Sequence, residues 1–295
     1  MIDRRFLLKG LAATLVSPAA GLRAQGSDGE LVSLETRDGR SVTVTRWRAS
    51  FRRGTILFSH GALSSPLKYA ALIAPWVAAG FDVWAPLHVD STDHPETRAF
   101  PGLASWPARI ADMRALAGHV GADRYVAAGH SYGALVALTL AGAMPTRPDG
   151  IDGSLRDRRV RASIAFSPPG PGLGLIDRPG YATLGTPALV QTGTLDVPPG
   201  ATAADAWRGH LAAYEAPAAN GARYGLVLEG VDHYFGGLIC RPELPGPKQR
   251  AQFDVAVAWS LAFLRAHGLG SAQARRLLQS AARRDPVIGP GLYRR

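Results

Sequence analysis

The chain has 295 residues, of which 46% are hydrophobic and 19% charged, and this composition excludes an intrinsically disordered protein. The net charge of +10 lies mostly at the ends, with +3 before Gln25, +5 from Gly270 onward and +2 in the body between them. A nearly neutral body argues against nucleic-acid binding as the main function, and the single cysteine, Cys240, excludes an internal disulfide.

Residues 1–24 have the layout of a secretory signal. Arg4, Arg5 and Lys9 precede a short apolar run, and Ala24 is a small residue at a cleavage position. The Arg4-Arg5 pair resembles the twin-arginine export motif. We therefore expect a cleaved signal and an exported protein, periplasmic or secreted, that begins at Gln25. An N-terminal anchor or a disordered tail is the alternative, although the apolar run is short for a membrane span.

The rest of the chain alternates between strand and helix patterns. The predicted strands are 31–36, 41–48, 55–59, 82–86, 125–128, 161–166, 188–192 and 223–228. The predicted helices are 67–79, 108–120, 132–144, 203–216 and 249–267, followed by a basic helix around 271–284. This order predicts the α/β class, with a mostly parallel central sheet flanked by helices on both faces.

A single catalytic domain is predicted over residues 25–270, because no break marks the start of a second one. The Pro- and Gly-rich segment 167–186 is too short for a large cap domain. Residues 271–295 form a basic C-terminal helix and tail that carries six arginines. This tail either packs on the body through Leu277 and Leu278 or makes a weak contact with an anionic membrane surface.

Ser131 lies in the stretch Gly-His-Ser-Tyr-Gly, between the predicted strand 125–128 and the helix that begins at Tyr132. Five letters alone are weak evidence, but a strand that turns at once into a helix forces the serine into a strained backbone conformation. Side chains at Gly129 and Gly133 would collide with the neighbouring strand and helix. The sequence therefore predicts that Ser131 is a nucleophile at the carboxyl edge of the sheet.

An activated serine needs a base, and the base needs an acid to orient it. Asp196 follows the predicted strand 188–192, and His233 lies in the loop after the next strand. We predict that His233 is the base and Asp196 its acid partner, in preference to Asp205, expected within a helix, and Asp232, which adjoins the histidine in sequence.

The order Ser131, Asp196, His233, together with "FSHGALSS", "GHSYG", "GTLDVPP" and "GVDHYF", resembles the α/β-hydrolase superfamily over nearly the whole mature length. The chain looks most similar to small bacterial serine esterases related to dienelactone hydrolase and platelet-activating-factor acetylhydrolase. The resemblance implies an α/β-hydrolase fold and an oxyanion hole formed by the backbone N–H groups of Ala62 and Tyr132.

The substrate cleft is expected to include His60, Leu63, His94 and Tyr234. His60 and His130 are expected to serve in packing and loop hydrogen bonds rather than as the base. The loop with His88, Asp90, Asp93 and His94 offers metal-ligand letters, but its spacing matches no firm pattern. We expect a cleft wall there, with no metal and no cofactor.

The sequence predicts a serine hydrolase for a small-molecule carboxylic ester. Two alternatives stay open: an amide or thioester hydrolase with the same triad, and a non-catalytic binding protein on a hydrolase fold.

Overall fold

The computed structural model describes residues 29–146, 148–149, 151, 154–171, 174–198, 200–217, 222–284 and 288–295. The predicted export signal, 1–24, lies outside the described residues. No helix in the described part of the chain is both long and apolar enough to cross a bilayer.

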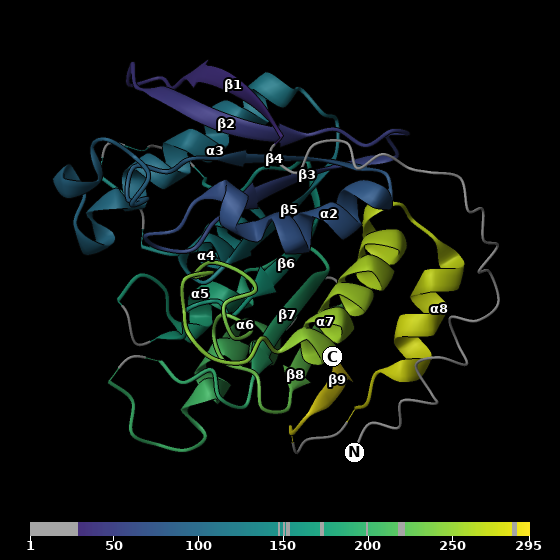
Figure 1. The fold of residues 1–295 in the computed structure, drawn as a ribbon. Coiled ribbons are helices and arrows are strands. Elements are labelled where there is room, and N and C mark those ends of the chain that lie inside the picture. The colour runs from purple at the N-terminus through teal and green to yellow at the C-terminus, as the bar shows by residue number, and fades with distance from the viewer. Residues whose placement is uncertain are drawn as a thin grey trace.

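The described residues form one sheet of nine strands, in the order β1-β2-β4-β3-β5-β6-β7-β8-β9 (Figure 1). The strands are β1 (Glu30–Glu35), β2 (Ser41–Trp47), β3 (Gly54–Ser59), β4 (Phe81–Pro86), β5 (Tyr125–His130), β6 (Val160–Phe166), β7 (Ala188–Gly193), β8 (Arg223–Leu228) and β9 (Gly291–Arg294). Strands β4 to β8 of this order run parallel, and β1, β2 and β9 are antiparallel additions at the two edges. The predicted mostly parallel sheet is confirmed.

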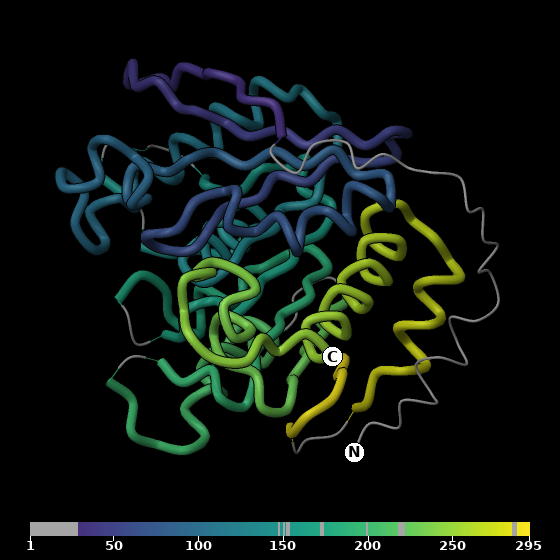
Figure 2. The backbone as a smooth tube through the Cα atoms, in the orientation of Figure 1, coloured from purple at the N-terminus to yellow at the C-terminus, as the bar shows by residue number. Residues whose placement is uncertain are grey.

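Helices cover both faces of the sheet (Figure 2). They are α2 (Ala70–Ala78), α3 (Trp106–Val120), α4 (Tyr132–Leu140), α5 (Arg178–Ala182), α6 (Ala212–Glu215), α7 (Arg250–Phe263) and α8 (Ala272–Ala281). One core packs α3, α4, α5 and α6 against the sheet, and the other packs α2, α7 and α8 against its opposite face. Strands such as β5 and β7 are buried along their whole length, because both faces are covered.

Two predicted helices differ in extent. The helix predicted over 132–144 ends at Leu140, because the chain reverses at Gly142 (φ 115°) and the N–H of Ala143 donates to the carbonyl of Leu138. The helix predicted over 203–216 is a 3₁₀ turn at Ala206–Leu211 followed by the short α6. Gly209 in this turn explains part of the difference, since glycine disfavours a helix interior.

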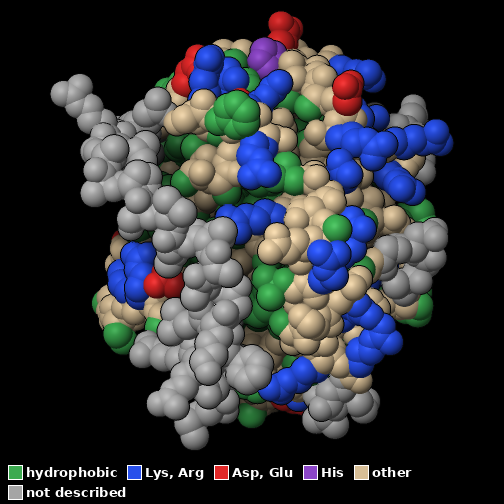
Figure 3. Space-filling view, turned by 90° about the vertical axis from the view of Figure 1, so that its right-hand side faces the viewer, with side chains coloured by type: hydrophobic (Ala, Val, Ile, Leu, Met, Phe, Trp, Pro, Cys, Tyr) green, Lys and Arg blue, Asp and Glu red, His purple; other side chains and the backbone are tan. Residues whose placement is uncertain are grey.

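The C-terminal segment contributes to both the surface and the sheet. Leu278 of α8 is buried, whereas Leu277 is 37% exposed. Arg275 and Arg276 are exposed on the same helix, and Figure 3 shows many Lys and Arg side chains and few Asp or Glu on the face that carries α8. Strand β9, which the sequence did not predict, pairs with β8 and closes that edge of the sheet.

Candidate active site

Ser131 occupies a strained turn between the buried strand β5 and helix α4. Its φ is 54° and its ψ is −123°, a region that costs a non-glycine residue about 1–3 kcal/mol. Its N–H donates to the carbonyl of Phe166 at 2.8 Å, and its side chain does not cap the helix that follows. Ser131 is half-buried at the carboxyl end of β5, and its hydroxyl makes no capping hydrogen bond to the helix.

The flanking glycines are required by close packing of this turn. A Cβ atom on Gly129 would lie 2.2 Å from the carbonyl oxygen of Gly133, and one on Gly133 would lie 2.0 Å from the carbonyl oxygen of Ser59. Both contacts are with backbone atoms, which cannot move aside as a flexible side chain can. The structure therefore agrees with the prediction that a side chain at either position would collide with its neighbours.

His233 and Asp196 lie together beside this turn. Nδ1 of His233 is 2.6 Å from Oδ1 of Asp196, and the Thr192 hydroxyl donates to the other carboxylate oxygen at 2.8 Å. Burial alone would raise the pKa of Asp196, but its close contacts with the rings of His210 and His233 hold it well below its usual range. The ionised carboxylate fixes the Nδ1–H tautomer of His233, which leaves Nε2 as the nitrogen that can accept a proton.

The rival acids have other roles. Asp205 is exposed, and its carboxylate lies 3.7 Å from Arg208. Asp232 accepts hydrogen bonds from the N–H groups of Tyr234 and Gly236, so it shapes the loop that carries His233. Neither carboxylate contacts the His233 ring.

A second histidine, His210, also faces Asp196, and the sequence analysis missed it. Its Nε2 is 3.1 Å from Asp196 Oδ1, and its Nδ1 is 2.8 Å from the carbonyl oxygen of Pro168. Both neighbours are acceptors, which suits a doubly protonated ring. Burial opposes this charge, but the interaction with Asp196 raises the pKa of His210 overall. No local signal marks His210, because tertiary folding alone brings it to Asp196 across 14 residues of chain.

Asp196, His210 and His233 are also the described residues that best match a metal-ligand set, with donor atoms within 4.8 Å of one another. Two imidazoles and one carboxylate suit several transition metals. However, His233 Nδ1 and Asp196 Oδ1 are already in direct contact at 2.6 Å, so an ion could not sit between them in this arrangement.

His130, the residue before Ser131, joins two loops of the site. Its Nε2 is 2.9 Å from the carbonyl oxygen of His233 and must donate to it, so Nδ1 accepts a hydrogen bond from the Tyr69 hydroxyl at 2.9 Å. The Tyr69 oxygen in turn accepts the N–H of Gly61 at 2.9 Å. Burial lowers the pKa of His130 to about 3, which agrees with a neutral ring. His130 therefore holds the loop of His233 next to Ser131, and both of its ring nitrogens are occupied by hydrogen bonds.

The two predicted oxyanion donors belong to the start of α4 and to the loop after β3, whose backbone packs against this turn. Tyr132 is the first residue of α4, so its N–H is one of those that lack an intrahelical acceptor. Ala62 follows β3 in an exposed turn, and its N–H donates to no backbone carbonyl in the part of the chain that the structure describes. Both groups are thus available to bind a developing negative charge.

The predicted cleft residues separate into two groups. Leu63 is 50% exposed and has a positive φ of 59°, and Tyr234 and His94 are half-buried. Tyr234 packs edge-on against His233 at 4.9 Å between ring centroids, whereas His94 is fixed by the N–H of Glu96. His60, in contrast, is completely buried beneath the loop and does not line the cleft.

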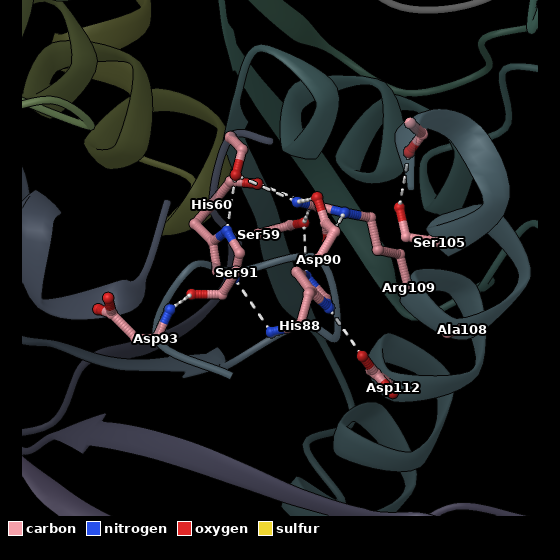
Figure 4. A network of polar contacts seen from close by, with 12 residues as sticks. Ser59, His60, His88, Asp90, Ser91, Asp93, Ser105, Ala108, Arg109 and Asp112 are labelled. Carbon is pink, nitrogen blue, oxygen red and sulfur yellow. Dashed lines mark hydrogen bonds and ion pairs between the residues drawn. The ribbon is translucent and has the colours of Figure 1, made fainter. Parts of the chain in front are cut away.

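The histidine- and aspartate-rich loop after β4 is part of a buried polar network (Figure 4). Burial keeps the pKa of His88 well below its usual value, and the neutral ring bridges the Ser59 hydroxyl at 2.9 Å and the Asp112 carboxylate at 2.8 Å. Asp90 binds Arg109 through both of its oxygens, each at 2.8 Å. These side chains therefore bind one another through hydrogen bonds and ion pairs.

Comparison with solved structures identifies the α/β-hydrolase fold. An esterase from the planctomycete Thermogutta terrifontis, solved with propionate bound, gives a TM-score of 0.57 at 16% identity, covering 84% of this chain and 98% of its own. A predicted CIB-like hydrolase from Thermoplasma acidophilum gives 0.52 at 17% identity, covering 80% and 97%. A protein assigned as a dienelactone hydrolase from Klebsiella pneumoniae gives 0.54 at 15%, covering 78% and 96%. No protein-family model and no curated protein matches the chain.

Proposed function

We propose that this chain is a serine hydrolase that cleaves carboxylic esters through an acyl-enzyme on Ser131. The observation that carries the proposal is the strained backbone of Ser131, with φ 54° at the end of a central strand, beside a histidine whose Nδ1 lies 2.6 Å from a buried carboxylate. Strain of this kind persists only where the surrounding structure enforces it.

In the first half-reaction, the Ser131 hydroxyl attacks the acyl carbon while Nε2 of His233 takes its proton. Asp196 holds the imidazole in the correct tautomer and stabilises the imidazolium that forms. The oxyanion of the tetrahedral intermediate accepts hydrogen bonds from the N–H groups of Ala62 and Tyr132, each of which is typically worth about 3 kcal/mol. The intermediate collapses when His233 returns the proton to the leaving alcohol.

In the second half-reaction, His233 removes a proton from water, and the resulting hydroxide attacks the acyl carbon on Ser131. Collapse of this second intermediate breaks the acyl–oxygen bond, and the proton on His233 restores the serine hydroxyl. The products are one carboxylic acid and one alcohol per water consumed, and no cofactor is needed.

The structural neighbours support the ester class. The Thermogutta terrifontis protein is described as an esterase with bound propionate, and the same esterase is phosphorylated by paraoxon. A short acyl group and an organophosphate are therefore the first probes to use on this chain.

The test is turnover of p-nitrophenyl esters, from acetate to palmitate, by the wild-type protein and by Ser131→Ala. We expect turnover that falls at least 1,000-fold in the variant, because loss of a triad nucleophile removes most of the rate enhancement. Ser163→Ala is the matched control: Ser163 is a buried serine on β6 whose hydroxyl has no partner among the described residues, so its loss should leave turnover unchanged.

The remaining outcomes decide between the alternatives. Full ester turnover by Ser131→Ala would overturn the proposal. If no ester is cleaved but paraoxon labels Ser131, the triad acts on another bond, such as an amide or thioester. If no ester is cleaved and no label forms, the chain is a binding protein on a hydrolase fold.

A further inference from the structure

Arg109 of α3 is a completely buried cation whose five N–H donors all have acceptors. Nε and Nη2 each donate to one oxygen of Asp90 at 2.8 Å. Nη1 donates to the carbonyl of His60 at 2.7 Å and to the Ser59 hydroxyl at 3.4 Å. Nη2 also donates to the carbonyl of Gly61 at 3.1 Å. Figure 4 shows the guanidinium between the loops that follow β3 and β4.

The Gly61 carbonyl belongs to the same peptide group as the Ala62 N–H. In a trans peptide the C=O and N–H point in opposite directions, so donors that fix the oxygen also fix the direction of the N–H. Besides Arg109, Nδ1 of His60 donates to this oxygen at 2.7 Å. A charged donor on the carbonyl also polarises the peptide, which strengthens the N–H as a donor.

Arg109 also contacts the residue that carries the second predicted donor. Its guanidinium carbon lies 4.6 Å from the ring centroid of Tyr132, a cation–π distance. Trp106 stacks on the same ring with centroids 5.8 Å apart. The side chain of Tyr132, and with it the start of α4, is thus packed by residues of α3.

We propose that Arg109 is a positioning residue that aligns the two oxyanion donors, Ala62 N–H and Tyr132 N–H, by holding the Gly61 carbonyl and the Tyr132 ring at once. The inference rests on the proposed function, because an oxyanion forms only if Ser131 attacks an acyl group. Arg109 itself does not touch the reacting atoms.

A purely structural role for Arg109 would be to neutralise the buried Asp90. Burial alone would raise the pKa of Asp90, but the Arg109 charge and its hydrogen bonds lower it to about 2. A structural role and a positioning role both predict lower stability when the guanidinium is lost. Only the positioning role predicts a specific loss of transition-state binding in the molecules that remain folded.

Arg109→Lys separates the two roles, because lysine keeps the positive charge but cannot bridge two carbonyls and a carboxylate with a planar fork. Arg223→Lys is the matched control: Arg223 is also completely buried and donates to the carbonyls of Ala213 and Leu184, at the opposite end of its strand from the loop that carries His233.

The experiment compares steady-state kinetics with p-nitrophenyl ester, per active site counted by complete organophosphate labelling. We expect Arg109→Lys to lower kcat at least 10-fold with KM changed less than about 3-fold, since loss of a whole oxyanion donor typically costs about 100- to 1,000-fold. The Ki of a trifluoromethyl ketone, which forms a tetrahedral adduct, should rise by the same factor as kcat/KM falls. The Ki of the product carboxylate, which is not a tetrahedral adduct, should stay unchanged. Arg223→Lys should show none of these changes.

Asp90→Asn is the second variant, in case Arg109→Lys does not fold. Asparagine keeps the shape of the aspartate but removes the carboxylate charge that holds the guanidinium. This variant should lower kcat and the affinity for the ketone together, by a smaller factor than Arg109→Lys. Equal kcat per active site in wild type and the folded variants would overturn the inference while leaving the proposed function intact. Absence of Ser131-dependent turnover in the wild type would instead overturn the proposed function, and the inference with it.

Discussion

A Tyr69→Phe substitution tests how strongly the hydrogen bonds of Tyr69 stabilise the loops that carry Gly61 and His130. The Tyr69 side chain is completely buried, and its single hydroxyl accepts the N–H of Gly61 and donates to Nδ1 of His130, both at 2.9 Å. In Tyr69→Phe both of these buried groups lose their partner. The vacated volume is that of one oxygen atom, which is too small for a water molecule to replace it.

The expected cost follows from the number of orphaned groups. A buried polar group left without a partner costs about 1–3 kcal/mol, so two of them give about 2–6 kcal/mol for Tyr69→Phe. Tyr181→Phe is the matched control, because Tyr181 is also completely buried but its hydroxyl makes one bond, to the carbonyl of Pro169. Only one acceptor is orphaned there, and we expect a cost of about 1–3 kcal/mol, half that of Tyr69→Phe.

Urea unfolding at pH 7, followed by fluorescence, measures both variants against the wild type. The slope of the free energy of unfolding with urea should be the same in all three proteins, so that a shifted midpoint reports stability alone. If Tyr69→Phe costs no more than Tyr181→Phe, the reasoning about this hydrogen-bond chain is wrong.

Two further predictions concern pH. Three histidines are buried with pKa values below their ordinary value: His60, His88 and His130. In the unfolded chain these histidines bind protons near pH 6.5, whereas folded His130 does so only near pH 3. His130 alone should therefore lower the free energy of unfolding by about 2 kcal/mol as the pH falls from 6.5 to 5. Urea unfolding at both pH values measures this, and greater stability at pH 5 would contradict it. His210 makes the opposite contribution, since its raised pKa adds stability that is lost as pH rises through that pKa. In His210→Phe the ring whose Nε2 lies 3.1 Å from Asp196 is removed, so the free energy of unfolding should fall less between pH 6 and pH 8 in the variant than in the wild type. An equal fall in the two proteins, measured by urea unfolding, would contradict this reasoning.

The sheet and the serine turn could be predicted because their signals are local. Fully apolar strands alternating with helical patterns indicate a covered parallel sheet. The glycines at 129 and 133 likewise reflect contacts within a few residues of Ser131 and with the neighbouring strand, β3. Strand β9 had no comparable signal, because a four-residue strand at an edge depends on the strand beside it.

The polar residues around Asp196, His233 and Ser131 were harder to find. His210 reaches Asp196 only through the path of the loop between them, which no periodicity encodes. The sequence does contain a signal for Arg109. It precedes Met113 by four residues, so it lies on the apolar face of its helix, where a charged residue is unusual. A charge at such a position must find partners or destabilise the fold, and the backbone carbonyls of the β3 loop provide them.

Gly61 is the point at which these contacts meet. Its carbonyl is held by Arg109 and His60, and its N–H begins the chain through Tyr69 and His130 that ends on the backbone of His233. One residue therefore connects the peptide that carries the Ala62 N–H, a proposed oxyanion donor, with the loop that carries His233, the proposed base. The proposed mechanism requires the base and the oxyanion donors to be aligned together. Contacts that join both loops through Gly61 would meet this requirement without a direct contact between the two groups.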